Sequence, residues 1–449
     1  MSLQEVQTLT GGQLSGADAS FNGVSIDSRT LKAGELFIAI SGENFNGNKF
    51  VSAAAEKHAA AAITTEKVDT ELSTLLVEDS RIALGKLAAC NRNLSEAKVI
   101  ALTGSQGKTT VKEMTASILA CCGEVLKTFG NLNNDFGAPL TLLKLEAKHQ
   151  FAVIELGANA PGEIAYSSAL AKPHIAHITN IAPTHLEGFG DLDGVARAKG
   201  EIWKSLDDDG IVVLNIDDAY GSQWMEKLKS RNFVSISALG KANADYKVAE
   251  MQFDDAIHSI FKLITPQGTI QINLPLPGQH NVANAIAAAA LSMQAGATLD
   301  DVKQGLESMR SVDGRMKTIS GLNNSILIDD SYNASPSSFM AAIDVLAQHE
   351  GSTIIAMGEM GELGDEAAQA HFDIGVYAKD KGINYLFGVG SLSESALSGF
   401  AGEGKISSDL EELGQYLKPM LNQQVKVLIK GSRSAGMDKL VQLLKAKGD

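Results

Sequence analysis

The feature that most constrains this chain is a short glycine-containing loop between an apolar run and a helical pattern. Residues 99–102 form a continuous apolar run, and residues 109–122 place apolar side chains on one helical stripe. Between them lie Gly104 and Gly107, followed at once by Lys108. In a strand–loop–helix of this kind, backbone N–H groups and the helix N-terminus bind phosphate. The sequence therefore predicts a nucleotide-binding α/β domain.

Individual residues of the loop have expected roles. Lys108 is expected to reach the β- and γ-phosphates of ATP, and the Thr109 hydroxyl is expected to bind Mg²⁺. The usual pattern has its first glycine where this chain has Leu102, so the loop is shorter here. The alternative is a strand–helix turn with an exposed lysine, which the flanking context disfavours. The predicted nucleotide-binding residues are Gly104, Ser105, Gln106, Gly107, Lys108, Thr109 and Thr110.

Apolar runs that alternate with helical patterns divide the chain into three segments. We predict an α/β fold with a small N-terminal domain at 1–97, a central P-loop, parallel-sheet, ATPase-like domain at 98–310, and a C-terminal Rossmann-like domain at 311–449. The first segment predicts a strand at 36–40 and a helix at 50–62, and residues 246–277 predict an antiparallel insertion or edge. The other predicted strands are 99–102, 151–154, 175–178, 211–214, 326–328, 353–356, 385–387 and 425–429.

Composition excludes several classes of function. The 449 residues carry 38 Lys and Arg against 53 Asp and Glu, a net charge of −15, which disfavours a general nucleic-acid-binding protein. The only cysteines, Cys90, Cys121 and Cys122, provide neither a disulfide framework nor metal-finger spacing. The first ten residues do not resemble a signal peptide, and no apolar run reaches the ~18 residues of a membrane span. We expect a cytoplasmic protein with no membrane span.

Polar residues follow two of the predicted central strands. Glu155 follows the strand at 151–154, and Asn180 and His185 follow the strand at 175–178. Ligands of open α/β sheets bind beyond the carboxyl ends of the strands, where a carboxylate and an imidazole suit Mg²⁺ held together with phosphate. The alternatives are a glutamate that caps a helix and a histidine bonded to loop backbone.

Lys199 occupies an unusual position on a predicted helix at 194–206. It falls on the apolar stripe formed by Val195, Ala198, Ile202 and Leu206. Burial promotes loss of the lysine proton, and a neutral amine can add CO₂ to form a carbamate that binds metal. The alternative is a lysine whose amine reaches solvent at the helix end.

An ordered set of short motifs extends along the whole chain. They are 26–29, 36–39 with 42, 46–47, 103–110, 130–134, 155–158, 180–181 with 185–187, 198–201, 278–281 with 284–285, 314–316, 329–334 with 336–338, 358–364 and 430–433. This set resembles the Mur ligases, a family of ATP-dependent amide-forming enzymes. The resemblance implies a monomer that uses ATP and Mg²⁺ to add D-alanyl-D-alanine to UDP-N-acetylmuramoyl-tripeptide through an acyl phosphate. The products would be the pentapeptide precursor of peptidoglycan, ADP and phosphate.

The resemblance also implies residue roles. In this family the short phosphate loop is normal, and the lysine matching Lys199 is carbamylated and helps to hold a second Mg²⁺. The implied catalytic residues are Lys108, Lys199, His185 and Arg315, and the implied metal ligands are Thr109, Glu155, His185 and Lys199. Nucleotide contacts are implied for Asn281, for Asn284 at the adenine, for Arg315 at a phosphate and for Asp330 at the ribose. Substrate contacts are implied for Ser28, Arg29, Asn46, Gly47, Asn133, Asn134, Asn333 and Arg433.

Two positions depart from the family pattern. Asn48 stands where a histidine is frequent, and Tyr332 stands where some relatives carry a phosphate-binding lysine. Arg433 is expected to bind the terminal carboxylate of the dipeptide, since guanidinium is a two-pronged donor; the alternative is a surface arginine that caps a helix. No general base can be identified, although His185 and Glu187 fall in the right region.

Two alternatives to this function remain at this point. One is a Mur-type ligase that adds a different amino acid. The other is a P-loop switch or ATPase that moves a partner. Such proteins usually have an apolar strand that ends in aspartate, together with an arginine finger. Here the candidate strand ends in Glu155 without a following acid.

Overall fold

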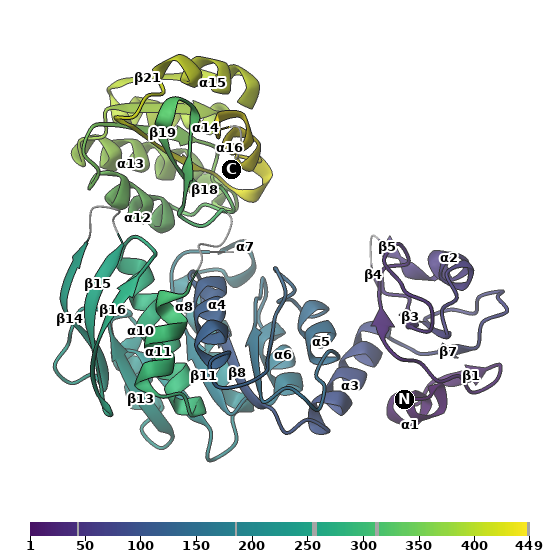
Figure 1. Ribbon diagram of the computed structural model, residues 1–449. Coiled ribbons are helices and arrows are strands. Elements are labelled where there is room, and N and C mark those ends of the chain that lie inside the picture. Colours follow the sequence, from purple (N-terminus) through teal and green to yellow (C-terminus); the bar gives the residue numbers. More distant parts are fainter. Residues whose placement is uncertain (43–44, 185, 254–257, 310–313, 447–449) are drawn as a thin grey trace. The chain divides into compact units, whose positions relative to one another are not determined.

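The computed structural model describes residues 1–42, 45–184, 186–253, 258–309 and 314–446 (Figure 1). They form two compact units. The first contains Met1–Thr103, Gly123–His177 and Ala198–Val212, and the second contains Gly104–Cys122, Ile178–Arg197 and Val213–Asp449. Helices alternate with strands of mostly parallel sheets in both units, so the predicted α/β class is confirmed.

The N-terminal part of the first unit is a small sheet in the order β1-β7-β6-β3-β2. Its strands pair in parallel except for β1 with β7, and its core packs Leu36 and Ile38 against Leu84 and Leu87 of α3. Its elements are α1 (Leu3–Thr10), β1 (Gln13–Ser15), β2 (Val24–Ser25), β3 (Leu36–Ile38), β4 (Ser41–Gly42), β5 (Phe45–Asn46), α2 (Val51–Glu56), β6 (Ala61–Thr64), β7 (Thr74–Leu76) and α3 (Ser80–Asn93).

The predicted helix at 50–62 was wrong over its second half. The helix α2 ends at Glu56, and residues 61–62 begin the buried strand β6. His58 adopts a left-handed backbone conformation with φ 58°, which a continuing helix cannot accommodate. Alanine is small enough to be buried in either kind of element, so the alanine-rich pattern could not reveal this boundary.

The rest of the first unit carries strands in the order β11-β8-β10-β9, with β10 parallel to both β8 and β9. The predicted helix at 194–206 is in fact α8 followed by a 3₁₀ segment, η2 (Gly200–Ser205). The elements of this part are β8 (Lys98–Thr103), β9 (Val125–Lys127), α5 (Gly137–Leu142), β10 (Phe151–Glu155), α6 (Glu163–Ala171) and β11 (Ile175–Ile178). The helix α7 (Leu186–Phe189) and most of α8 (Leu192–Lys199) belong to the second unit, and β12 (Ile211–Asn215) crosses the unit boundary.

In the second unit, α4 (Lys108–Leu119) follows the glycine loop, and strands follow in the order β16-β15-β14-β13-β12. β13 and β14 are parallel, whereas β14, β15 and β16 pair antiparallel, which confirms the predicted change near 246–277. The remaining elements are α9 (Gly221–Lys227), β13 (Asn232–Ser237), β14 (Tyr246–Phe253), β15 (Ser259–Thr265), β16 (Gly268–Leu274), α10 (Gln279–Ala295) and α11 (Leu299–Glu307).

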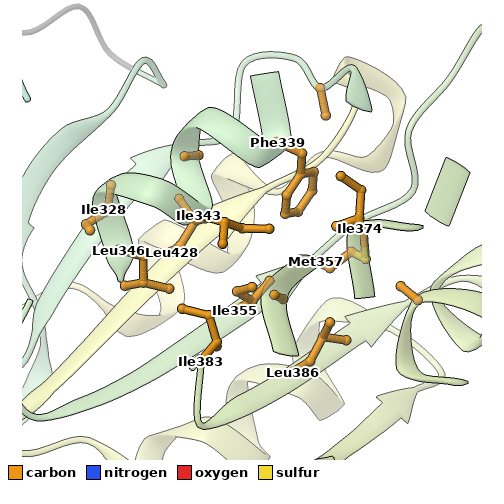
Figure 2. Packing of buried hydrophobic residues seen from close by; sticks show 14 of the residues in the cluster. Ile328, Phe339, Ile343, Leu346, Ile355, Met357, Ile374, Ile383, Leu386 and Leu428 are labelled. Atoms are coloured by element: carbon orange, nitrogen blue, oxygen red, sulfur yellow. The ribbon is translucent and has the colours of Figure 1, made fainter. Parts of the chain in front are cut away.

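The C-terminal part of the second unit is a sheet in the order β17-β18-β22-β19-β20-β21, parallel except for the β17–β18 pair. Figure 2 shows one of its cores, in which Phe339 and Ile343 of α12 lie near Ile355 and Met357 of β19. Its elements are β17 (Lys317–Ser320), β18 (Ile326–Asp330), α12 (Pro336–Leu346), β19 (Ser352–Met357), α13 (Ala367–Asp380), β20 (Tyr385–Val389), α14 (Ser391–Phe400), β21 (Glu403–Ser407), α15 (Leu410–Leu417), β22 (Val425–Lys430) and α16 (Asp438–Leu444).

Within the described parts of the chain, every helix is too short or too polar to cross a membrane.

Candidate active site

The glycine loop has a backbone that only glycine accommodates. Gly104 and Gly107 have φ values of 143° and 78°, a region that L side chains rarely adopt. A Cβ at Gly104 would lie 2.0 Å from Thr179 Oγ1, and a Cβ at Gly107 would lie 2.5 Å from Asn284 Oδ1. Both glycines are therefore required by the backbone conformation and by the packing around it.

The end of β11 holds the loop in place. The amide of Ser105 donates to the carbonyl of Asn180 at 2.9 Å, and the amide of Gln106 donates to Asn180 Oδ1 at 3.0 Å. The Ser105 hydroxyl and Ala182 exchange two bonds of 2.9 Å, and Thr179 Oγ1 donates to the Gln106 carbonyl at 2.5 Å. Asn180 was predicted as a polar group at the ligand-binding end of its strand; the structure places its side chain against the backbone of the loop.

Lys108 and Thr109 begin α4 directly after the loop. The Lys108 amine donates to the carbonyls of Gly104 at 2.7 Å and Ser105 at 3.2 Å, so the lysine folds back over its own loop. Thr109 Oγ1 accepts from the Arg315 guanidinium at 3.1 Å, and Thr110 is buried in the first helical turn. Arg315 is 206 residues from Thr109, so the fold joins a predicted magnesium ligand to the arginine for which the resemblance implies a phosphate contact.

The predicted adenine region lies at the start of α10. Asn281 and Asn284 are both buried, and Asn284 Nδ2 donates to Asn281 Oδ1 at 3.3 Å. Asn281 Nδ2 donates to the Pro277 carbonyl at 2.7 Å. Asn284 also limits the space around Gly107, so the structure brings this predicted pair to the glycine loop.

Asp330 lies at the end of β18 opposite Lys430 at the end of β22, where the two are register partners. The Lys430 amine, 2% exposed, donates to Asp330 Oδ2 at 2.5 Å and to the Asn333 carbonyl at 2.9 Å. Asp330 Oδ1 accepts from the Met316 amide at 3.1 Å. The carboxylate with the implied ribose contact is thus fixed at both oxygens. The sequence interpretation gave Lys430 no role separate from its motif. A lysine and an aspartate that each end an apolar strand could have indicated this ion pair.

In the first unit, Glu155 ends β10 with 1% exposure. Asn133 Nδ2 donates to Glu155 Oε1 at 2.8 Å, and the Gly157 amide donates to the Asn133 carbonyl at 2.8 Å. The 130–134 motif therefore reaches the predicted metal carboxylate through Asn133. Asn134, by contrast, accepts the Gly137 amide at 2.8 Å at the start of α5.

Lys199 ends α8 and is 1% exposed, so its amine does not reach solvent. The amine lies 3.4 Å from the Ala158 carbonyl, three residues beyond Glu155. Glu201 accepts the amides of Gly162 and Ala165 at 3.1 Å and so caps the N-terminus of α6. Glu201, two residues after Lys199, therefore ties the segment that carries Lys199 to the start of α6.

The loop of the N-terminal sheet, described at 41–42 and 45–48, carries Asn46 and Gly47 with implied substrate contacts. It is organised by Asn48, which is 4% exposed. Asn48 Nδ2 donates to Thr65 Oγ1 at 2.9 Å, to Asn46 Oδ1 at 3.0 Å and to Ser41 Oγ at 3.1 Å, while Asn48 Oδ1 accepts the Thr65 amide at 3.0 Å. Gly47 is buried, with no room for a Cβ. The departure from histidine at Asn48 thus has a structural role in the loop.

Ser28 and Arg29 follow Asp27 in the turn after β2 of the same sheet. Arg29 is exposed and makes a two-pronged ion pair with Asp27, with Nη2 to Oδ2 at 2.8 Å. Hydrogen bonds from Arg29 lower the pKa of Asp27 to about 2. Ser28 is half-buried.

Several predicted residues are not joined to these clusters. His185 lies outside the described residues, and Asn333 is exposed, with its Oδ1 accepting the amide of Ala334. No group of three or more metal-binding side chains occurs among the residues that the structure describes. The sequence singled out Tyr332 only as a departure from a family lysine; in the structure its ring lies under both Arg315 and Arg433.

Comparison with known proteins identifies the family over nearly the whole chain. Family models described as "Mur ligase family, catalytic domain", "Mur ligase middle domain" and "Mur ligase, glutamate ligase domain" match residues 20–116, 102–292 and 314–433. The UDP-N-acetylmuramoyl-tripeptide–D-alanyl-D-alanine ligase of Escherichia coli K12 is 44% identical over 100% of this chain and 99% of its own length.

Two solved structures are also similar. A crystal structure of MurF from Acinetobacter baumannii has a TM-score of 0.91 at 36% identity and covers 98% of this chain and 97% of its own. MurF ligase from Thermotoga maritima in complex with ADP has a TM-score of 0.83 at 26% identity and covers 94% and 96%. The chain belongs to the Mur ligase family.

Proposed function

We propose that this ligase joins D-alanyl-D-alanine to UDP-N-acetylmuramoyl-tripeptide, with ATP as the source of free energy. The observation that carries the proposal is full-length similarity at 44% identity to a ligase named for that reaction, combined with a strand–loop–helix whose packing requires both glycines of the loop. Neither a different amino-acid ligase nor a nucleotide switch accounts for both observations.

The first step is the phosphorylation of the tripeptide carboxylate. A carboxylate oxygen attacks the γ-phosphorus of ATP, the bond to ADP breaks, and an acyl phosphate forms. Two anions must meet, so positive charge from the chain is needed where the transition state spreads its charge. We assign this role to Lys108 and Arg315. The Lys108 amine bonds to the Gly104 carbonyl of the loop, and the Arg315 guanidinium bonds to the Thr109 hydroxyl.

Mg²⁺ fits the oxygen donors that the sequence singles out. In the second unit the proposed magnesium ligand is the Thr109 hydroxyl, and in the first unit the proposed ligands are the Glu155 carboxylate and a carbamate on Lys199. The imidazole of His185 stays a further predicted ligand. When bound, the ion would offset the negative charge of the phosphate oxygens. Each described donor is already positioned: Thr109 by Arg315 and Glu155 by Asn133.

The second step is attack of the dipeptide amine on the acyl carbon. The carbon–oxygen bond to phosphate breaks as the new amide bond forms, and the amine proton is released. Arg433, exposed at the end of β22, would bind the dipeptide carboxylate and hold the amine in line. Asn133, Asn134 and Asn333 complete the proposed peptide contacts.

The N-terminal sheet would bind the uridine diphosphate of the nucleotide-peptide. Arg29 supplies an exposed guanidinium, and Asn46 and Gly47 lie in the loop that Asn48 organises. The division into domains at 1–97, 98–310 and 311–449, the monomeric state and the cytoplasmic location stay predictions.

The proposal is tested by measuring ADP, phosphate and joined peptide with each substrate omitted in turn. The ligase should release little phosphate until nucleotide-tripeptide and D-alanyl-D-alanine are both present. A panel of nucleotide-peptides against D-dipeptides would then define the preferred pair. Steady hydrolysis of ATP without either substrate, and no joined peptide, would instead support a nucleotide switch.

The proposed carbamate on Lys199 has its own test. A ¹³C-labelled bicarbonate supply should produce a carbamate NMR signal in the wild type that Lys199→Ala lacks. The variant should be inactive and should regain some activity with short added carboxylates. Full activity of the wild type in bicarbonate-free buffer would contradict the carbamate.

A further inference from the structure

Two arginines lie over a single aromatic ring in the C-terminal part of the second unit. The guanidinium carbon of Arg315 lies 4.5 Å from the centroid of the Tyr332 ring, and that of Arg433 lies 5.6 Å from it. Both distances fall within the ~6 Å range of cation–π attraction. The two guanidinium carbons are consequently at most 10.1 Å apart, the sum of the two distances.

The ring belongs to a rigid part of the fold. Tyr332 follows β18, and Arg433 follows β22, which pairs in parallel with β18. The amide of Tyr332 donates to the carbonyl of Gly314 at 3.0 Å, and a Cβ at Gly314 would meet Tyr332 Cβ at 3.0 Å. The loop beyond Tyr332 is held by the bond from Lys430 to the Asn333 carbonyl.

The segment that carries Arg315 is fixed on both sides. The Gly314 amide donates to Asp329 Oδ2 at 3.2 Å, and the Met316 amide donates to Asp330 Oδ1 at 3.1 Å. The backbone on both sides of Arg315 is therefore anchored to the two aspartates that end β18, and Tyr332 is tied to the same segment through the carbonyl of Gly314.

Whether each guanidinium is paired with a carboxylate decides how much positive charge it can offer to a bound anion. Across the described ranges, neither Arg315 nor Arg433 lies within ion-pair distance of a carboxylate. An aromatic ring orients a guanidinium through its quadrupole without neutralising it, whereas a carboxylate would cancel its charge. Both arginines keep their charge for anions that come from outside the chain.

The reaction supplies two such anions. If the proposed function is correct, a phosphoryl group approaches Arg315, and the carboxylate of the dipeptide approaches Arg433. We propose that Tyr332 is a positioning residue that sets the spacing between the phosphoryl-binding and the carboxylate-binding arginine. Where some relatives place a lysine that supplies its own charge, this chain has a ring that arranges two existing charges.

The test compares three variants with the wild type. Tyr332→Leu removes the π face, Tyr332→Phe retains it without the hydroxyl, and Tyr377→Leu removes a similar ring that lies under Lys381 at 5.0 Å in the same part of the fold. Tyr332→Leu should lower kcat and raise KM for D-alanyl-D-alanine, each by about fivefold, as expected when contacts of ~1 kcal/mol are lost. Tyr332→Phe and Tyr377→Leu should stay within twofold of the wild type.

A double-mutant cycle separates positioning from loss of structure. Arg433→Lys should raise KM for the dipeptide in the wild type and have a smaller effect in the Tyr332→Leu background, because the ring acts through the arginine. Additive effects, or a Tyr332→Phe variant as impaired as Tyr332→Leu, would overturn the inference.

Binding measurements keep this inference distinct from the proposed function. Calorimetry with the β,γ-methylene analogue of ATP and with D-alanyl-D-alanine requires no turnover. Both dissociation constants should rise about fivefold in Tyr332→Leu only. A wild type that binds both probes but forms no joined peptide would contradict the proposed function, and the Tyr332 inference would still be decided by the dissociation constants. Unchanged constants in Tyr332→Leu, or no binding of either probe to the wild type, would contradict the inference.

Discussion

Two loops of this ligase are proposed to hold substrates, and an asparagine organises each of them in a different way. In the glycine loop, Asn180 comes from another strand end, 74 residues away, and accepts the amide of Gln106. In the loop of the N-terminal sheet, Asn48 belongs to the loop itself and bonds to Ser41, Asn46 and Thr65. The first loop depends on long-range packing, and the second depends mainly on its own side chains.

The difference shows which changes each loop should tolerate. The glycine loop offers backbone N–H groups to phosphate, so it fails when a side chain intrudes or when its single lysine is lost. The N-terminal loop offers side chains, so it fails when its internal bonds are removed.

The largest effect is expected for Lys108→Ala. Loss of the ammonium next to the transferred phosphoryl group should lower the rate of acyl-phosphate formation by about 10³-fold or more. Single-turnover assays of ADP formation with ATP and nucleotide-tripeptide measure this step. The exposed Lys86→Ala on α3 serves as the control and should match the wild type. Acyl-phosphate formation retained in Lys108→Ala would contradict the assignment.

Gly107→Ala should weaken nucleotide binding by about a hundredfold, because the added Cβ would lie 2.5 Å from Asn284 Oδ1. The matched control is Gly382→Ala, whose φ of 77° is close to the 78° of Gly107 but where a Cβ meets nothing within 4 Å. Gly382→Ala should cost only ~1–2 kcal/mol of stability and leave nucleotide affinity unchanged. Equal affinities of the two variants, measured by calorimetry with ADP, would show that the contact with Asn284 is unimportant.

Sequence reasoning predicted the α/β class, the glycine loop and the antiparallel change near 246–277, because each depends on local periodicity or turn chemistry. It placed Lys199 on a buried stripe, and the lysine is 1% exposed. It misplaced the end of the helix at 50–62, where alanines suit a helix or a buried strand and the left-handed residue His58 decides.

The contacts between distant side chains could not be predicted in this way. Nothing local indicates that Arg315 reaches Thr109 or that Tyr332 lies under two arginines, since the fold brings Thr109 and Arg433 to these residues from distant parts of the sequence. The roles of the Asn180 and Asn48 side chains could not be predicted from the sequence either. Both were recognised in or beside motifs, but only the hydrogen bonds reveal that their side chains hold backbone.

Asn180→Ala tests whether the Asn180 side chain holds the glycine loop. Without Oδ1 the Gln106 amide loses its partner, the loop is less well ordered, and KM for ATP should rise about tenfold. Asn422→Ala removes a bond of the same kind, to the Gln424 amide at 2.9 Å in an exposed turn, and should not change KM. An unchanged KM in Asn180→Ala would mean that the carbonyl of residue 180 suffices to hold the loop.

Asn48→Ala tests the N-terminal loop. Loss of its buried bonds should destabilise the loop by about 2 kcal/mol, leaving Thr65 without its hydrogen-bond acceptor. Hydrogen exchange measured by mass spectrometry should show faster exchange over 41–65 and no change over 104–110. Asn46→Ala is the control for lost substrate contact: it should raise KM for the nucleotide-peptide with a smaller change in exchange. A variant with faster exchange in the glycine loop would refute the independence of the two loops.

The smallest effect concerns the ion pair between Asp27 and Arg29 in the turn after β2. The pKa of Asp27 is lowered from 3.8 to about 2 by hydrogen bonds from Arg29. A carboxyl group with a lowered folded pKa stabilises the fold above its unfolded pKa, and this contribution is lost as the pH falls from about 4 toward 2. Titration by ¹³C NMR should show the Asp27 pKa rising toward 3.8 in Arg29→Gln, while Glu412, lowered to about 2 by Lys405, stays unchanged. UDP that recruits Arg29 should shift the Asp27 pKa in the same upward direction in the wild type. No shift on addition of saturating UDP would mean that Arg29 stays with Asp27 and does not bind the diphosphate.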